Sequence, residues 1–153
     1  MWIPPEQKDP VLVHCPTRKA VGYYGAVRLR DGKFIYQREE DLFNGEGFWH
    51  FMLTLRQKGQ RAGRQIVVIT DNARYHHARR HKQLRQSVAQ EFRLDFLPPY
   101  SPELNPIERV WKQTRRSCLQ YFAFLSDVIK AVEGQFQQWR RPNDVLRRLC
   151  SIV

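Results

Sequence analysis

Two acidic residues, Asp71 and Glu108, stand at positions where a protein can use carboxylates for chemistry. Asp71 directly follows residues 66 to 70, IVVIT, a short apolar run that is typical of a strand buried on both faces by helices. We interpret this run as a central parallel strand. Because ligands of open α/β sheets collect at the carboxyl ends of the strands, Asp71 is a candidate site residue.

Glu108 closes a proline-rich stretch, residues 97 to 108, which reads LPPYSPELNPIE. Asn105 suits an N-cap and Pro106 suits the first position of a helix, so we expect a helix to begin there. Glu108 lies at the flank of the apolar stripe of that helix, which comprises Ile107, Val110, Trp111, Thr114 and Cys118. The prolines fix the exit of the preceding strand and the entry of the helix, which preorganises the carboxylate.

Two carboxylates on neighbouring elements can hold a pair of Mg²⁺ ions, which prefer oxygen ligands. Two such ions, about 3.5 to 4 Å apart, support in-line phosphoryl transfer. Simpler interpretations stay open for each residue. Glu108 could complete a capping box with Asn105 or pair with Lys112, and Asp71 with Asn72 could form an ordinary turn.

The charge balance favours a polyanionic partner. The 153 residues include 26 Lys and Arg against 15 Asp and Glu, which gives a formal charge of +11 and a pI near 10.1. Basic residues lie on the helices expected near residue 74 and from Pro106. They could bind phosphates, or they could form only a solubilising face. They are Arg74, Arg79, Arg80, Lys82, Arg85, Arg109, Lys112, Arg115 and Arg116.

The remaining pattern predicts one α/β domain over residues 17 to 153 after an extended lead-in over residues 1 to 16. Its elements are a hairpin (21 to 29 and 33 to 37), a helix capped by Asn44 and ended by Gly59, the strand 66 to 70, a helix from Arg74 to about Gln90, a strand 94 to 97, and helices from Pro106, Asp127 and Asp144. The part from about residue 106 onward is helical. Trp111, Phe136 and Trp139 fall at core spacing.

Several other classes of protein are disfavoured. Cys15, Cys118 and Cys150 are odd in number and widely spaced, which indicates neither a disulfide framework nor a zinc site. His77 and His81 lack a third ligand at a sensible spacing. Without a membrane-spanning run or a signal peptide, the chain is expected to be soluble, with no membrane partner, in a reducing cytoplasm.

Two stretches of sequence resemble the catalytic domain of DDE transposases, in the mariner-like branch found in bacterial insertion sequences. They are ITDNARYHHA and LDFLPPYSPELNPIERVWKQTRR. A third stretch, GAVRLRDGKF, resembles a further part of that domain. The similarity therefore covers residues 2 to about 120. The 36 residues between Asp71 and Glu108 resemble the family's spacing between its second and third metal-binding carboxylates.

The resemblance implies a ribonuclease H-like fold with a mixed five-stranded sheet and flanking helices. It implies two Mg²⁺ or Mn²⁺ ions per complete site, cleavage of DNA at transposon ends, and joining of the freed 3′-hydroxyl to target DNA. Asp71 and Glu108 would then be catalytic metal ligands, with Asn72, His76 and Asn105 lining the site. The protein would act at the nucleoid, as a homo-oligomer or together with a full-length transposase.

One departure from the family concerns its first catalytic Asp, which lies on the first, central strand. We expect that residue and strand upstream of Met1, since Asp9, Asp31 and Asp41 are poorly placed substitutes. The chain would then be a C-terminal piece of a transposase, inactive alone. The alternatives are a noncatalytic DNA-binding remnant or regulator of a full-length transposase, and a ribonuclease H-like nuclease acting on RNA hybrids or junctions.

Overall fold

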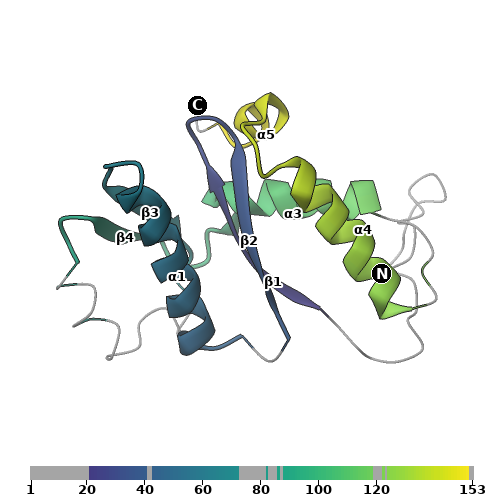
Figure 1. Cartoon of the computed structure of the whole chain (residues 1–153), viewed down its shortest axis with the longest axis horizontal. Helices are drawn as coiled ribbons and strands as arrows, with labels where there is room; N and C mark the ends of the chain where they lie inside the picture. The colour runs from purple at the N-terminus through teal and green to yellow at the C-terminus, as the bar shows by residue number, and fades with distance from the viewer. Residues whose placement is uncertain are drawn as a thin grey trace. The chain divides into compact units, whose positions relative to one another are not determined.

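The computed structural model describes residues 21–40, 43–72, 82, 86, 88–118, 122 and 124–151 (Figure 1). The chain divides into two compact units. Unit 1 comprises residues 1–36 and 106–153, and unit 2 comprises residues 37–105. The expected lead-in and most of the helix expected from Arg74 lie outside the described residues. The single-domain boundaries stay a prediction.

The structure confirms the predicted hairpin as β1 (Gly22–Arg28) paired with β2 (Lys33–Glu39), and its turn and all but the last three residues of β2 belong to unit 1. In the turn, the Arg28 guanidinium donates hydrogen bonds of 2.7 and 2.5 Å to the Asp31 carboxylate. These bonds lower the pKa of Asp31 below its usual value. The Asp31 side chain is therefore engaged in the turn.

Gly32 completes this turn with a left-handed backbone, at φ +70°. A β-carbon at this position would lie 2.0 Å from the carbonyl oxygen of Asn143, and the Asn143 N–H donates to the Asp31 carbonyl at 2.8 Å. The hairpin turn is thus fastened directly to the chain that enters the last helix, and a glycine is needed for the close approach.

Three helices complete the described part of unit 1: α3 (Pro106–Cys118), α4 (Leu125–Gln138) and α5 (Asp144–Leu149). All three were predicted, although α4 begins two residues before Asp127. Asn143 caps α5, its side-chain oxygen accepting a 3.0 Å hydrogen bond from the Leu146 N–H. Helix α3 packs against β1, α4 and α5.

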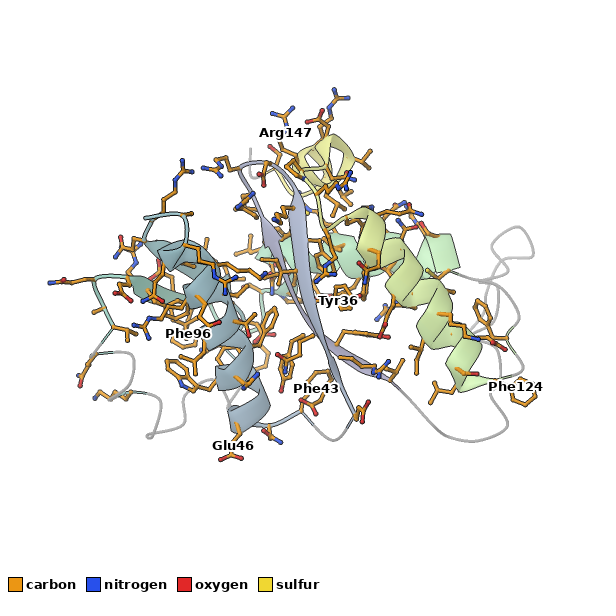
Figure 2. The ribbon with its side chains drawn as sticks, viewed as in Figure 1. Tyr36, Phe43, Glu46, Phe96, Phe124 and Arg147 are labelled. Carbon is orange, nitrogen blue, oxygen red and sulfur yellow. The ribbon has the colours of Figure 1, made fainter. Side chains whose placement is uncertain are left out.

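The core of unit 1 is dense in aromatic side chains. Its buried members are Phe34, Val110, Phe136, Trp139, Leu146 and Cys150. Phe136 packs against Phe34 and Tyr36 with ring centroids 4.9 Å apart in each pair, and Figure 2 labels Tyr36 on β2. Trp111 covers Gly25 so closely that a β-carbon there would lie 2.4 Å from the indole. The predicted core roles of Trp111, Phe136 and Trp139 are confirmed.

Unit 2 contains α1 (Gly45–Gln60), β3 (Ile66–Thr70) and β4 (Phe92–Phe96). Asn44 caps α1 as predicted, accepting a 2.8 Å hydrogen bond from the Gly47 N–H. Helix α1 ends at Gln60, one residue after Gly59, the predicted end. Ile66 packs closely against Gly59, with an Ile66 side-chain carbon 2.3 Å from where a β-carbon would stand.

The two strands of unit 2 pair in parallel, with Ile66 opposite Phe92 and Thr70 opposite Phe96. The parallel character of residues 66 to 70 is confirmed, whereas the second strand begins two residues earlier and ends one residue earlier than predicted. Burial on both faces is wrong for β3. Its side chains alternate: Val67 and Ile69 remain 45% and 42% exposed, whereas Ile66 packs against Gly59 of α1.

The order of strands and helices makes a mixed α/β protein, which is compatible with a ribonuclease H-like fold. Among the described residues the strands form two sheets of two strands each, so the larger five-stranded mixed sheet stays a prediction. None of the helices that the structure describes is long and apolar enough to span a membrane.

Candidate functional site

Asp71 lies at the carboxyl edge of the parallel sheet in unit 2. It is exposed and follows the last residue of β3 directly. The Leu97 N–H donates a 2.8 Å hydrogen bond to the Thr70 carbonyl, so the pairing of the two strands reaches the position next to Asp71. The carboxylate therefore stands where parallel strands present ligands, as the sequence predicts. Asn72 beside it is also exposed.

Glu108 lies in the first turn of α3 in unit 1, and its side chain is exposed. The helix is fixed in the core through Val110, which is completely buried, and through the partly buried Ile107 and Trp111. The backbone that carries Glu108 is thus held firmly while the carboxylate faces solvent.

The two simpler interpretations of Glu108 are not seen. The Asn105 N–H donates to the Pro102 carbonyl at 3.0 Å, which takes the place of the capping-box bond from Glu108. Within the part of the chain that the structure describes, the Glu108 side chain forms neither a hydrogen bond nor an ion pair, with the Lys112 side chain or with any other residue. Glu108 is therefore available for another partner.

Helix α3 places two of the predicted phosphate-binding cations in a row with Glu108. Lys112 and Arg115 follow it by four and seven residues, a spacing that keeps side chains on one flank of a helix. Both are exposed, as is Arg116, about 40° beyond Lys112 on the helical wheel. A phosphate near Glu108 would thus meet positive charge on the same helix.

Arg109 has a different position among the predicted cations. Its guanidinium Nη1 donates to the carbonyls of Leu149 and Ser151 at 3.0 and 3.1 Å. These oxygens belong to the last residue of α5 and to the residue after its C-cap, where a cation also meets the negative end of the helix dipole. The structure therefore gives Arg109 a fastening role between α3 and α5, a role that the sequence pattern did not reveal.

Among the other predicted residues, Asn105 is buried and Lys82 is exposed. Asn105 is 8% exposed and directly precedes α3, so its side chain is buried at the helix start. Outside the described residues lie His76, Arg74, Arg79, Arg80 and Arg85, together with His77 and His81.

Carboxylate oxygens are the donor type that Mg²⁺ and Mn²⁺ prefer, and both Asp71 and Glu108 are exposed to solvent from which an ion can arrive. The two residues belong to different units. No group of three or more His, Cys, Asp or Glu side chains that could hold a metal is found among the residues described.

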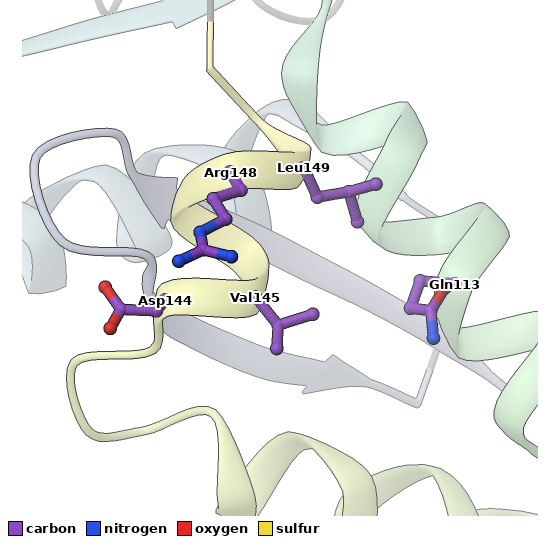
Figure 3. Close-up of a pocket in the computed structure, with 5 residues that line it drawn as sticks. All are labelled: Gln113, Asp144, Val145, Arg148 and Leu149. Atoms are coloured by element: carbon purple, nitrogen blue, oxygen red, sulfur yellow. The ribbon is translucent and has the colours of Figure 1, made fainter.

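A hollow of about 520 Å³ lies between α3 and α5 (Figure 3). It is lined by Gln113, Asp144, Val145, Arg148 and Leu149. Its single carboxylate, on Asp144, is bonded to the Arg147 guanidinium at 3.0 Å. Since neither Asp71 nor Glu108 lines the hollow, it does not belong to the candidate site.

The loop between β4 and α3 contains a residue that the sequence pattern did not single out. Tyr100 adopts φ +59°, and its side chain is fully exposed at 101%. The flanking Pro98, Pro99 and Pro102 indicated a stiff loop, but nothing in the sequence indicated a left-handed tyrosine.

Comparison with known families identifies the class of protein. Residues 1–129 match the family described as DDE superfamily endonuclease, a range that includes both Asp71 and Glu108. The chain belongs to this family, and its domain is of the DDE transposase type. DDE endonuclease domains act on DNA and generally use divalent metals. Comparison with curated proteins gives no match.

Proposed function

We propose that the chain is the catalytic domain of a mariner-like bacterial transposase, in which Asp71 and Glu108 are ligands of divalent metal. The proposal unites two carboxylates from different units of the chain. The family assignment, the exposed position of each carboxylate and the spacing of 36 residues between them support it.

The observation that carries the proposal is the state of Glu108. An exposed carboxylate with no partner in the described part of the chain contributes little to stability, whereas the helix beneath it is held by a buried aromatic core. Rigid support beneath an unengaged side chain is what a ligand site requires. The resemblance to the family then gives that carboxylate its role.

Two Mg²⁺ or Mn²⁺ ions, when bound, supply activation of the attacking oxygen and stabilisation of the leaving oxygen in phosphoryl transfer. The protein's own contribution is to hold the two carboxylates and to bind the DNA backbone. Lys112, Arg115 and Arg116 would contact phosphates beside Glu108, which gives affinity that depends on salt and little on sequence. Asn72, His76 and Asn105 would line the site.

The proposed reaction is cleavage at transposon ends followed by transfer of the freed 3′-hydroxyl into target DNA. Both DNA molecules are substrates, and such joining requires the two ends to be held together. We therefore propose a homo-oligomer, or association with a full-length transposase, acting at the nucleoid.

The test is nicking of supercoiled plasmid in Mg²⁺ or Mn²⁺. It uses the chain as given and the chain extended by the residues encoded directly upstream of Met1. Asp71→Ala and Glu108→Ala are each expected to reduce nicking to the level of a metal-free reaction, because each removes a metal ligand. Glu103→Ala, which removes an exposed carboxylate nearby in sequence, is the matched control and should nick like the parent.

DNA affinity separates this proposal from its main alternative, a noncatalytic DNA-binding regulator. Both predict salt-sensitive DNA binding, and both predict that Asp71→Ala and Glu108→Ala bind DNA at least as well as the parent, since a negative charge is removed. Only the catalytic proposal predicts metal-dependent nicking. If neither form of the parent nicks, or if both variants nick as well as the parent, the catalytic assignment is wrong.

A further inference from the structure

Tyr100 combines two unusual properties. A φ of +59° is unfavourable for a residue with a β-carbon, and such conformations concentrate at functional sites. Its side chain is fully exposed, so no packing against the described residues offsets the cost. The chain thus presents a large aromatic ring to solvent in a strained conformation.

The loop around Tyr100 is held in place by local constraints. Pro98 and Pro99 precede it, and the Ser101 hydroxyl lies 3.4 Å from the Pro99 carbonyl oxygen. The following 3₁₀ turn, η3 (Pro102–Leu104), is closed by a 3.2 Å bond from the Leu104 N–H to the Ser101 carbonyl. Proline and these bonds restrict the backbone, so the ring is presented from a defined place.

That place adjoins Asp71 within the same unit. Leu97, which bonds to the Thr70 carbonyl, leaves the sheet at the edge where Asp71 leaves it. Tyr100 follows Leu97 by three residues, a distance of at most about 11 Å along the chain. The exposed ring is therefore within reach of a nucleic acid strand whose backbone lies at Asp71.

We propose that Tyr100 stacks on an unpaired DNA base next to the site of cleavage. An exposed aromatic ring offers a surface for any base, and a DNA strand opened for cleavage exposes bases that can stack. Leu104, 51% exposed on the same loop, adds apolar surface. The inference rests on the proposed function, because it takes DNA as the substrate and Asp71 as part of the site.

The experiment compares two probes: a 20-nucleotide single strand and the duplex of the same sequence. Binding of the full chain is measured by fluorescence anisotropy. Tyr100→Ala is expected to weaken binding of the single strand by about 5- to 150-fold, the range for loss of one stacked base. Binding of the duplex should change by less than about two-fold, since its bases are already stacked. Tyr100→Phe keeps the ring and should bind both probes like the parent.

A second readout reports the contact directly. A single strand carrying 2-aminopurine loses fluorescence when the analogue stacks, so the parent and Tyr100→Phe should quench it and Tyr100→Leu should not.

Lys112→Ala supplies the contrast, because loss of a phosphate contact weakens the binding of both probes together and reduces the salt dependence of binding by about one ion. Tyr100→Gly tests the strain: it should raise the thermal midpoint while losing the preference for the single strand.

The outcomes separate the two proposals. If the parent binds neither probe, both the proposed function and this inference fail. If the parent binds DNA and Tyr100→Ala binds and quenches equally well, only the role of Tyr100 is wrong. A Tyr100→Ala variant that loses self-association in light scattering, with unchanged DNA binding, would assign the ring to a protein interface and overturn the inference. Circular dichroism confirms that each variant is folded.

Discussion

The two units of the molecule fix their acidic residues in different ways. In unit 1, the helix bearing Glu108 is packed against a hairpin and two further helices through a buried aromatic core. In unit 2, the strand that leads to Asp71 is covered by α1 on one face, while Val67 and Ile69 are about half exposed on the other.

This difference indicates which interactions hold Glu108 and Asp71 in place. Glu108 is placed by side-chain packing around its helix, so changes in the core of unit 1 should be costly. Asp71 is placed chiefly by backbone pairing of β3 with β4 and by packing on one side of the sheet. Substitutions on the open face of β3 should therefore have small effects on folding.

Two glycines with the same backbone conformation provide the sharpest contrast. Gly32 in unit 1 and Gly63 in unit 2 have φ +70° and +60°. Gly32→Ala would place its β-carbon 2.0 Å from the Asn143 carbonyl oxygen, whereas nothing lies within 4 Å of a β-carbon at Gly63. We expect Gly32→Ala to lower the free energy of unfolding by about 4 kcal/mol, the sum of backbone strain and a steric clash.

Gly63→Ala is the matched control, and its cost should be about 1 kcal/mol, from the backbone conformation alone. Urea denaturation followed by circular dichroism measures both. Equal losses of stability in the two variants would show that the hairpin turn is not fastened to α5 as described.

A matched pair of valines tests the two environments of the apolar side chains. Val110 on α3 is completely buried, and Val67 on β3 is 45% exposed. Val110→Ala should cost about 2 kcal/mol, because it removes buried methyl groups and leaves a cavity. Val67→Ala should cost less than about 1 kcal/mol. The same urea denaturation experiment measures both losses of stability. A larger loss in Val67→Ala than in Val110→Ala would mean that the open face of β3 is covered in solution.

Local sequence patterns predicted most elements well. The turn chemistry of Asp31 and Gly32, the cap at Asn44, the apolar run 66 to 70 and the proline at the start of α3 each depend on near neighbours. Their positions were therefore readable from the sequence. The positions of Asp71 and Glu108, after a strand and in the first turn of a helix, followed from the same local rules.

The features that were missed depend on contacts between distant residues. The environment of Gly59 is set by Ile66, and the partners of Arg109 lie about forty residues away at the end of α5. The exposed face of β3 follows from which elements cover the sheet, which the apolar run alone does not determine. The left-handed backbone of Tyr100 contradicts local preference, and sequence rules fail at such strained positions.

The central claim is that Asp71 and Glu108 share divalent metal, and Mn²⁺ binding measured by electron paramagnetic resonance tests it most directly. The samples are the parent, Asp71→Ala, Glu108→Ala, the double variant and the Glu103→Ala control. A shared site predicts that each single variant weakens binding at least about ten-fold, that the double variant is much less affected than the product of the two effects, and that Glu103→Ala matches the parent. Unchanged Mn²⁺ affinity in both single variants, or losses that simply multiply in the double variant, would contradict the account.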